Sequence, residues 1–471
     1  MWSGLMSFSH QILALFFTIV IARLLTPADF GMVGLLAIFT ACATTLQDGG
    51  LIWALANRTN VTKEQYSTIF WFNVSLSALL YVILYLAAPQ IALYYHQPKL
   101  LWLSRLVFVG IFLSSFGIVQ NAYLYKQLEV KERTIATISS QVISGVIGVI
   151  MAYNGFAYWG IATQGVLMIL ANVIILWIYS PFRPLLHFDV QFLKEILPQG
   201  VRFLVPNIFS IVSENVFSLV LGRRYHVKDV GNYTQAVRWN VSTYSIVLGM
   251  LRNVTQPVLV QVRQSPEDYL RIFRKLFRMA AFLIVPSLLF LSMVSLEFIQ
   301  VLLTEKWLQS ALILRILCIG GIVSTLNTMF TYFIMSLKRT TLYMYCGIGV
   351  STVSILAAVI VSSWGVIALA YSNVIISIIT FAFYYYFVRQ THSYTIKQLS
   401  DDLLPVLIFS IIDVILVYLT TNWIEQPLLR LIFRITLAAI IYVFSMSRVK
   451  FDSYIESKKY IVNILRRINH G

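Results

Sequence analysis

The sequence predicts an all-α integral membrane protein, and three observations support that fold class. Of the 471 residues, 59% are hydrophobic and only 11% are charged, whereas a soluble domain would hold roughly 25% charged residues. The hydrophobic residues form runs of about 20, which is the length of a membrane-spanning helix. Most of the 35 lysines and arginines lie in the short connections between those runs. A large soluble helical protein is therefore excluded.

Fourteen apolar segments are predicted to be transmembrane helices. In chain order they are residues 4–25, 30–48, 66–88, 100–124, 134–153, 157–179, 199–221, 229–251, 279–303, 310–336, 340–361, 364–388, 403–421 and 428–447. The proline-containing turn LLTPAD joins the first two. Pro206 and Pro286 interrupt the seventh and ninth segments, which favours bent helices there.

The basic residues of the connections predict the orientation of the chain. The even-numbered connections and the C-terminal tail carry 23 lysines and arginines, the odd-numbered connections carry 6, and another 6 lie inside the predicted spans. Cytoplasmic loops of membrane proteins hold the excess of Lys and Arg, so both termini are expected in the cytoplasm. The net charge of +16 thus reflects membrane topology, and nucleic acid is not an expected partner.

One basic connection, SPEDYLRIFRKLFR at 265–278, predicts a helix that lies on the membrane surface. Ser265 is placed to cap this helix, and Pro266 and two acidic residues occupy its first turn. Apolar side chains share one face and basic ones the other, respectively Tyr269, Ile272, Phe273, Leu276 and Phe277, and Arg271, Arg274, Lys275 and Arg278. Such a helix faces anionic lipid headgroups, and a regulatory docking site is the alternative. The tail at 448–471 is similar but less regular.

Two sequence matches at nearly the same offset indicate an internal duplication. The stretches ARLLTPADFG at 22–31 and GRRYHVKDVG at 222–231 share the pattern R-x5-D-x-G at an offset of 200. RLVFVG at 105–110 matches RILCIG at 315–320 at an offset of 210, and both open the fourth segment of their set. A duplicated unit of six helices accounts for both matches.

The duplication predicts the domain organisation. Residues 1–180 form a first six-helix lobe, 196–388 form a second, 401–447 hold two extra helices, and 448–471 form a cytoplasmic tail. Because six is an even number, both lobes enter the membrane from the same side and are parallel repeats. Transporters built from such repeats bind substrate between the lobes and alternate access by rocking.

Several stretches resemble one known family. They are WSGL, IARLLTPADFG, NRTNVTKEQYSTIFWFN, SLVLGRRYHVKDVGNYTQAVR and LLTEKWLQSALILRILC. They are similar to the polysaccharide export family of Wzx-type polysaccharide and O-antigen flippases, part of the multidrug/oligosaccharidyl-lipid/polysaccharide superfamily, and the resemblance covers nearly the whole chain. The resemblance implies 14 spans, with two six-helix lobes around a central cavity. It also implies movement of undecaprenyl-pyrophosphate-linked oligosaccharides from the cytoplasmic to the outer leaflet of the bacterial plasma (inner) membrane.

The resemblance further implies the partners: the lipid-linked oligosaccharide, membrane lipids, and the polymerase and chain-length proteins of the pathway. No cofactor or metal is expected, and coupling to a H⁺ or Na⁺ gradient is left open. A multidrug exporter of the same superfamily is the alternative function, but six arginines against four acidic residues in the spans favour an anionic substrate. A membrane enzyme is disfavoured because the longest outside connection, 89–99, has only about 11 residues.

Arg238 is the most informative charge in the predicted spans. It lies ~13 Å inside the eighth span, and Glu214 lies ~10 Å inside the seventh, at 1.5 Å per residue. An ionisable residue at such depth is a functional candidate, because burying it in lipid is costly. Two interpretations remain open: a structural ion pair between the two residues, or a cavity guanidinium that binds the pyrophosphate or acidic sugars.

The other charges in the spans have simpler interpretations. Arg105, Arg315 and Arg430 are expected to extend to the outer headgroups, and Arg202 to the inner ones. Glu297 is expected to be hydrated at the outer edge. Asp413 and Arg434 match in depth and predict a structural ion pair between the last two spans.

The predicted substrate-binding set combines charged and neutral polar residues of the first, sixth, seventh and eighth spans. It consists of Arg238, Glu214, Asn215, Arg202, Gln11 and Gln164. Further candidates along the same path are His10, Gln141, Asn172 and Asn207. For each neutral residue, a hydrogen bond between helices is the alternative to a sugar contact.

Overall fold

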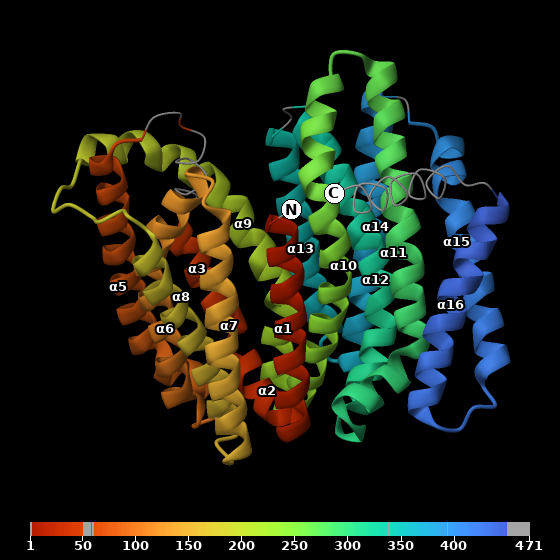
Figure 1. The fold of residues 1–471 in the computed structure, drawn as a ribbon, viewed down its shortest axis with the longest axis horizontal. Coiled ribbons are helices and arrows are strands. Elements are labelled where there is room, and N and C mark those ends of the chain that lie inside the picture. The colour runs from red at the N-terminus through yellow and green to blue at the C-terminus, as the bar shows by residue number, and fades with distance from the viewer. Residues whose placement is uncertain (1, 50–57, 59–60, 338–339, 393, 450–471) are drawn as a thin grey trace, which may run out of the picture. The chain divides into compact units, whose positions relative to one another are not determined.

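The computed structural model describes residues 2–49, 58, 61–337, 340–392 and 394–449, and every regular element in these ranges is a helix (Figure 1). Each of the fourteen predicted segments overlaps a helix, and the second is divided into two. The helices of the first half are α1 (Trp2–Leu24), α2 (Pro27–Gly34), α3 (Ala37–Asp48), α5 (Lys63–Tyr94), α6 (Leu100–Lys126), α7 (Val130–Tyr153) and α8 (Tyr158–Tyr179). The predicted tail at 448–471 lies almost entirely outside the described residues.

The second half begins with three long helices. They are α9 (Val190–Arg224), α10 (Val227–Val262) and α11 (Pro266–Leu303). A short 3-10 helix, η1 (Glu305–Trp307), precedes α12 (Leu308–Ser336), α13 (Thr340–Val361), α14 (Val366–His392), α15 (Ile396–Thr421) and α16 (Pro427–Val449).

Eleven helices of the described residues are long and apolar enough to cross a membrane, so the chain is a multi-pass membrane protein. These eleven do not include α9 and α10. Both helices are long, with 35 residues in α9 and 36 in α10, and the side chains of several residues in each lie outside the described part of the chain. The predicted count of fourteen spans and the predicted lobe boundaries remain predictions.

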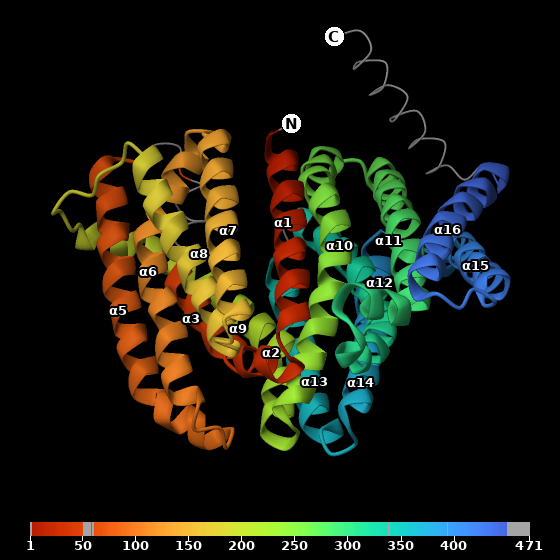
Figure 2. The same cartoon turned by 60° about the horizontal axis from the view of Figure 1, so that its bottom comes forward.

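The chain forms two compact units. The first contains residues 1–234 and 351–366, and the second contains 235–350 and 367–471. In the first unit, α7 packs against α1 and α8, and α6 packs against α5 and α8, as both views show (Figures 1 and 2). An aromatic core closes one end of this unit, where the ring of Phe182 packs on Tyr66 and Tyr123.

In the second unit, α11 is the central element. It packs against α12, α15 and α16, and the last two also pack against each other. The interior side of α11 is rich in aromatic and aliphatic residues, and Tyr269, Phe273 and Phe277 are fully buried. The two helices that end the chain are therefore an integral part of the second unit.

The segment at 265–278 differs from its prediction in one respect. Ser265 caps the helix as predicted, because its side chain accepts the backbone N–H of Asp268. The helix then continues without a break to Leu303. Its apolar face does not lie on the membrane surface, because the ring of Phe273 packs against Phe330, Phe333 and Tyr394. The prediction of a surface helix is wrong, since these partners lie on segments that are distant in the sequence.

The buried charges of the second unit also pair differently from the prediction. Arg434 donates to Glu297 at 2.8 Å and to the hydroxyl of Thr421 at 3.0 Å, and Arg430 approaches Glu297 at 3.4 Å. Glu297 is 6% exposed, so it is not a hydrated edge residue. Asp413 instead accepts the hydroxyl of Ser445 at 3.2 Å. The predicted Asp413–Arg434 pair and the predicted extension of Arg430 to the headgroups are therefore wrong.

The Glu297–Arg434 pair provides a stability prediction. Glu297→Ala leaves the guanidinium of Arg434 buried without its carboxylate, and breaking a buried pair in this way costs about 3–5 kcal/mol. We expect a large drop in the melting temperature of the detergent-purified protein. Arg430→Gln is the matched control, because it removes the longer contact with Glu297 and a hydrogen bond to the carbonyl of Ile424 while it leaves the Glu297–Arg434 pair intact, so its effect should be smaller. Equal melting temperatures of Glu297→Ala and Arg430→Gln would contradict a central role of the pair.

Candidate functional site

The two repeated turns, α1–α2 and α9–α10, have the same local structure. In the first turn, the backbone N–H of Thr26 donates to the carboxylate of Asp29, and the N–H of Asp29 donates back to the Thr26 carbonyl. In the second, His226 and Asp229 make the same two hydrogen bonds. The D in R-x5-D-x-G is therefore explained by helix capping. Its carboxylate accepts a hydrogen bond from a backbone N–H at the N-terminus of the helix, which has no partner within the helix.

The glycines of the same pattern bring the two turns into backbone contact. A Cβ atom on Gly31 would overlap the carbonyl oxygen of Val227, and a Cβ atom on Gly231 would overlap the carbonyl oxygen of Pro27. These contacts are reciprocal, because Val227 and Pro27 are themselves 200 residues apart. Such reciprocity is the contact pattern of two elements related by a local twofold axis. Glycine is required at both positions because no side chain fits between the two backbones.

A third contact lies between the same turns, one helical turn further on. A Cβ atom on Gly34 would lie 3.1 Å from Cγ2 and 3.4 Å from Oγ1 of Thr234. Gly34 and Thr234 are again 200 residues apart, so here equivalent positions meet each other. The three contacts form one tight junction, called the turn junction below, which lies at the predicted outer end of α1 and α9.

The face of α9 that carries Glu214 is polar and exposed. Asn207, Ser210 and Glu214 recur at helical spacing and are all exposed, and the Ser210 hydroxyl donates to Glu214 at 3.3 Å. Glu214 lies ten residues before the end of α9 at Arg224, about 15 Å along the helix. A carboxylate exposed at that depth in a membrane helix needs contact with water, because lipid cannot solvate it.

The face of α10 that carries Arg238 is exposed as well. Arg238, Val241, Ser245 and Gly249 recur at helical spacing and are all exposed. The other side of α10 packs within the second unit, where the ring of Trp239 meets Phe298 edge to face at 4.9 Å. Arg238 lies eleven residues after Val227, about 16 Å along the helix. Its guanidinium is therefore presented away from the packed side of its helix.

The structure places the neutral candidates in different surroundings. Asn215 donates to the carbonyl of Ile211 in its own helix at 2.9 Å. Gln164 lies against Gly148 of α7, so it faces the α7–α8 contact. Asn172 donates to the hydroxyl of Ser140 at 3.5 Å, which is the helix–helix alternative.

The remaining predicted site residues on α1 and α9 are Gln11, His10 and Arg202. Gln11 and His10 are half-buried on α1. The side chain of Arg202 lies outside the described residues. Glu214 and Arg238 belong to different units, so the ion pair between them stays a prediction, as does the substrate-binding role of the whole set.

The arrangement is suited to binding a charged ligand. No group of three histidine, cysteine or acidic side chains suited to a metal ion occurs within the described part of the chain. Exposed polar side chains lie along α9 and α10, and they include the carboxylate of Glu214 and the guanidinium of Arg238. A guanidinium in a membrane helix is suited to hold an anionic group by paired hydrogen bonds.

Comparison with known protein families assigns the chain to proteins of polysaccharide biosynthesis. Residues 20–312 match the family described as "Polysaccharide biosynthesis protein". The chain is 26% identical over 347 residues to the teichuronic acid biosynthesis protein TuaB of Bacillus subtilis, covering 73% of this chain and 71% of that protein. It is 24% identical over 326 residues to the lipopolysaccharide biosynthesis protein WzxC of Escherichia coli, covering 68% and 65% of the two chains.

Solved structures of low sequence identity share the fold. The lipid II flippase MurJ in an inward closed conformation matches 96% of this chain and 99% of its own, with a TM-score of 0.78 at 16% identity. An inward-facing multidrug resistance MATE transporter of the MOP superfamily matches 82% and 94%, with a TM-score of 0.65 at 17% identity. The chain therefore belongs to the polysaccharide biosynthesis protein family, and it has the fold of the MurJ flippase and the MATE transporters.

Proposed function

We propose that this protein is a flippase for undecaprenyl-pyrophosphate-linked oligosaccharides in the bacterial plasma membrane. It moves repeat units of a surface polysaccharide from the cytoplasmic to the outer leaflet, with both of its own termini in the cytoplasm. The exposed guanidinium of Arg238, deep in a membrane helix of a polysaccharide biosynthesis family member, is the observation that supports this cargo best. The pyrophosphate is the invariant anionic part of such a lipid, and the guanidinium matches its charge and geometry.

Alternating access is the proposed mechanism, and the turn junction supports it. Two turns held backbone to backbone at the predicted outer end would keep the outer side closed while substrate enters from the cytoplasm. Opening to the outside then requires the junction to part. Packed interfaces of this kind favour two discrete arrangements over continuous deformation.

Loss of the protein in its host provides the direct test. We expect a strain that lacks it to lose the surface polysaccharide and to accumulate complete lipid-linked repeat units at the cytoplasmic leaflet. A polymerase defect would leave single repeat units at the outer leaflet. A glycosyltransferase defect would leave incomplete units. Complete units found at the outer leaflet of the deletion strain would overturn the flippase function.

The MATE-like fold makes multidrug export the second candidate function. A carrier of organic cations binds its substrate with carboxylates, and the exposed Glu214 on α9 is such a group. We expect susceptibility to cationic dyes and drugs to be unchanged in the deletion strain, because Arg238 would repel a cation. A several-fold rise in susceptibility, restored by the wild-type chain, would favour the exporter instead.

A further inference from the structure

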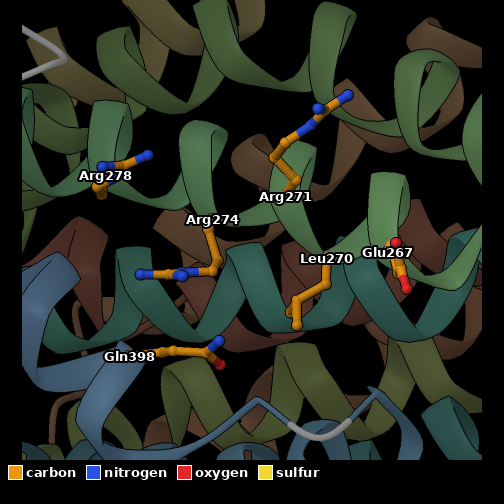
Figure 3. A pocket seen from close by; sticks show the side chains of 6 residues that line it. All are labelled: Glu267, Leu270, Arg271, Arg274, Arg278 and Gln398. Carbon is orange, nitrogen blue, oxygen red and sulfur yellow. The ribbon is translucent and has the colours of Figure 1, made fainter.

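A surface pocket at the start of α11 gathers three arginines in the second unit. It has a volume of about 360 Å³ and is lined by Glu267, Leu270, Arg271, Arg274, Arg278 and Gln398. Figure 3 shows Arg274 and Arg278 on the same side of the pocket, with Gln398 across from Arg274, whereas Arg271 extends away from them. This end of α11 belongs to the most basic connection of the chain, on the predicted cytoplasmic side. The pocket is therefore expected at the level of the inner headgroups.

Two of the arginines are held in place by one buried carboxylate. Arg274 donates to both oxygens of Asp402, at 2.8 and 2.9 Å, and Arg278 approaches the same carboxylate at 3.6 Å. The Asp402 side chain is 1% exposed, whereas those of Arg274 and Arg278 are 24% and 25% exposed. Two cations therefore share one buried anion while part of each guanidinium remains at the surface. The hydroxyl of Tyr394 also donates to Asp402, at 2.8 Å, and completes the support.

The third arginine is available at the rim of the pocket. Arg271 contacts Asp268 at 2.7 Å, with the two side chains 77% and 48% exposed. Such surface pairs are weak and exchange readily for another anion. The three arginines of the pocket lie near the carboxylate of Glu267 and are partnered by those of Asp268 and Asp402. A phosphate group would accept hydrogen bonds from the parts of these guanidinium groups that remain exposed.

The equivalent region of the first unit lacks these arginines. Thr62, Glu64, Tyr66 and Ile69-Phe70 recur 203 residues later as Ser265, Glu267, Tyr269 and Ile272-Phe273, so the starts of α5 and α11 correspond. At the positions of Arg271 and Arg274, α5 has Thr68 and Trp71. These two neutral side chains hydrogen-bond the backbone of Asp189 and Leu185 in the following connection. Anchoring that connection therefore does not require charge, and the arginines are an addition specific to the second unit.

We propose that this pocket binds the headgroup phosphate of a lipid in the inner leaflet, an anionic phospholipid such as phosphatidylglycerol. Basic pockets between membrane helices on the cytoplasmic side suit anionic headgroups, and the planar guanidinium pairs with phosphate oxygens. The site is separate from Arg238 and Glu214, and it does not depend on the transported cargo. The lipid would hold α11 against α15, since Arg274 belongs to the first helix and Asp402 and Gln398 to the second.

The test compares two double variants of equal charge. Arg271→Gln/Arg278→Gln removes two arginines of the pocket and leaves the Arg274–Asp402 pair intact. Lys275→Gln/Arg315→Gln removes two positive charges from α11 and α12 at positions that do not line the pocket. The full-length proteins, purified in detergent, are titrated with phosphatidylglycerol and phosphatidylcholine, and bound lipid is counted by native mass spectrometry. Two further titrations use undecaprenyl phosphate and inorganic phosphate.

We expect the wild type and the Lys275→Gln/Arg315→Gln control to retain phosphatidylglycerol over phosphatidylcholine. The pocket variant should bind it about tenfold more weakly or worse, because it loses charge-assisted hydrogen bonds. The single variants Arg271→Gln and Arg278→Gln should each show part of the loss if the double variant is unstable. A second outcome is that the wild type retains undecaprenyl phosphate in preference to phosphatidylglycerol, and that the pocket variant loses it. That result would still support a site for a lipid phosphate and would assign it to the carrier lipid.

Three results would overturn the inference. They are equal binding by the pocket variant and the wild type, equal losses in the pocket variant and the control, and retention of inorganic phosphate without either lipid. The readout is lipid binding, so a negative result here leaves the proposed transport function untouched. Conversely, failure of the transport experiment would not change the lipid measurement.

Discussion

Arg238→Ala is expected to abolish export of the surface polysaccharide while the protein is still made and inserted. The variant removes a guanidinium that is exposed on α10 about 16 Å from the start of the helix. Charge-assisted hydrogen bonds contribute about 1.5–3 kcal/mol each. Loss of two such bonds to a pyrophosphate therefore lowers export by about a hundredfold or more. Surface polysaccharide is measured in a deletion strain that expresses the variant, with protein level checked by immunoblot.

Two further variants separate the cavity role from the structural one. Arg238→Lys keeps the charge and loses the planar fork, so export should recover only in part. In Arg238→Ala/Glu214→Ala, both members of the predicted ion pair are absent. If the arginine served only to neutralise Glu214, the double variant would restore export. Wild-type export by the double variant would therefore exclude a substrate-binding role of Arg238.

A reversible cross-link across the turn junction is expected to stop export completely. A Cβ atom on Gly34 would lie 3.1 Å from Cγ2 of Thr234, so cysteines at both positions can reach the separation that a disulfide needs. The bond of Gly34→Cys/Thr234→Cys would prevent the α1–α2 and α9–α10 turns from parting. Alternating access would then be arrested with the outer side closed. Export is measured after oxidation and again after addition of a membrane-impermeant reductant.

The controls for the cross-link use the same proteins. Each single cysteine variant should export normally under oxidation, since one introduced thiol cannot form a disulfide across the turn junction. The reduced double variant should recover, which distinguishes arrest from a packing defect. Export that continues in a fully cross-linked sample would show that the junction does not need to open.

Local signals in the sequence anticipated much of the structure. The apolar runs located the helices because a transmembrane helix needs about 20 apolar residues and hydrogen-bonds its own backbone. Ser265 was recognised as a cap because capping depends on neighbours three residues apart. The R-x5-D-x-G repeat indicates two equivalent turns because its aspartate caps the helix and its glycine allows the close backbone contact. A second repeat, from Thr62 to Phe70 and from Ser265 to Phe273, carries the same kind of signal but is not among the predictions.

Pairings between distant segments were predicted poorly. Depth counting matched Asp413 with Arg434, yet Arg434 pairs with Glu297, and Asp413 bonds Ser445. Depth along a helix says nothing about the direction in which a side chain points around it. The error for the apolar face at 265–278 has a similar cause. Hydrophobic periodicity indicates that a helix face is buried, but it does not show whether lipid or another helix covers that face. Asp402, the partner of Arg274, gave no local signal at all.

The membrane class, the helix positions and the repeated turns follow from the sequence alone, because they depend on composition or on residues within a few positions of one another. The three-dimensional packing is needed to show that Gly31 and Gly231 meet backbone to backbone, that Glu297 pairs with Arg434, and that Arg274 and Arg278 share Asp402. These contacts join residues from 124 to 200 positions apart. They depend on how helices rotate and pack, which is set by the side chains of several helices at once.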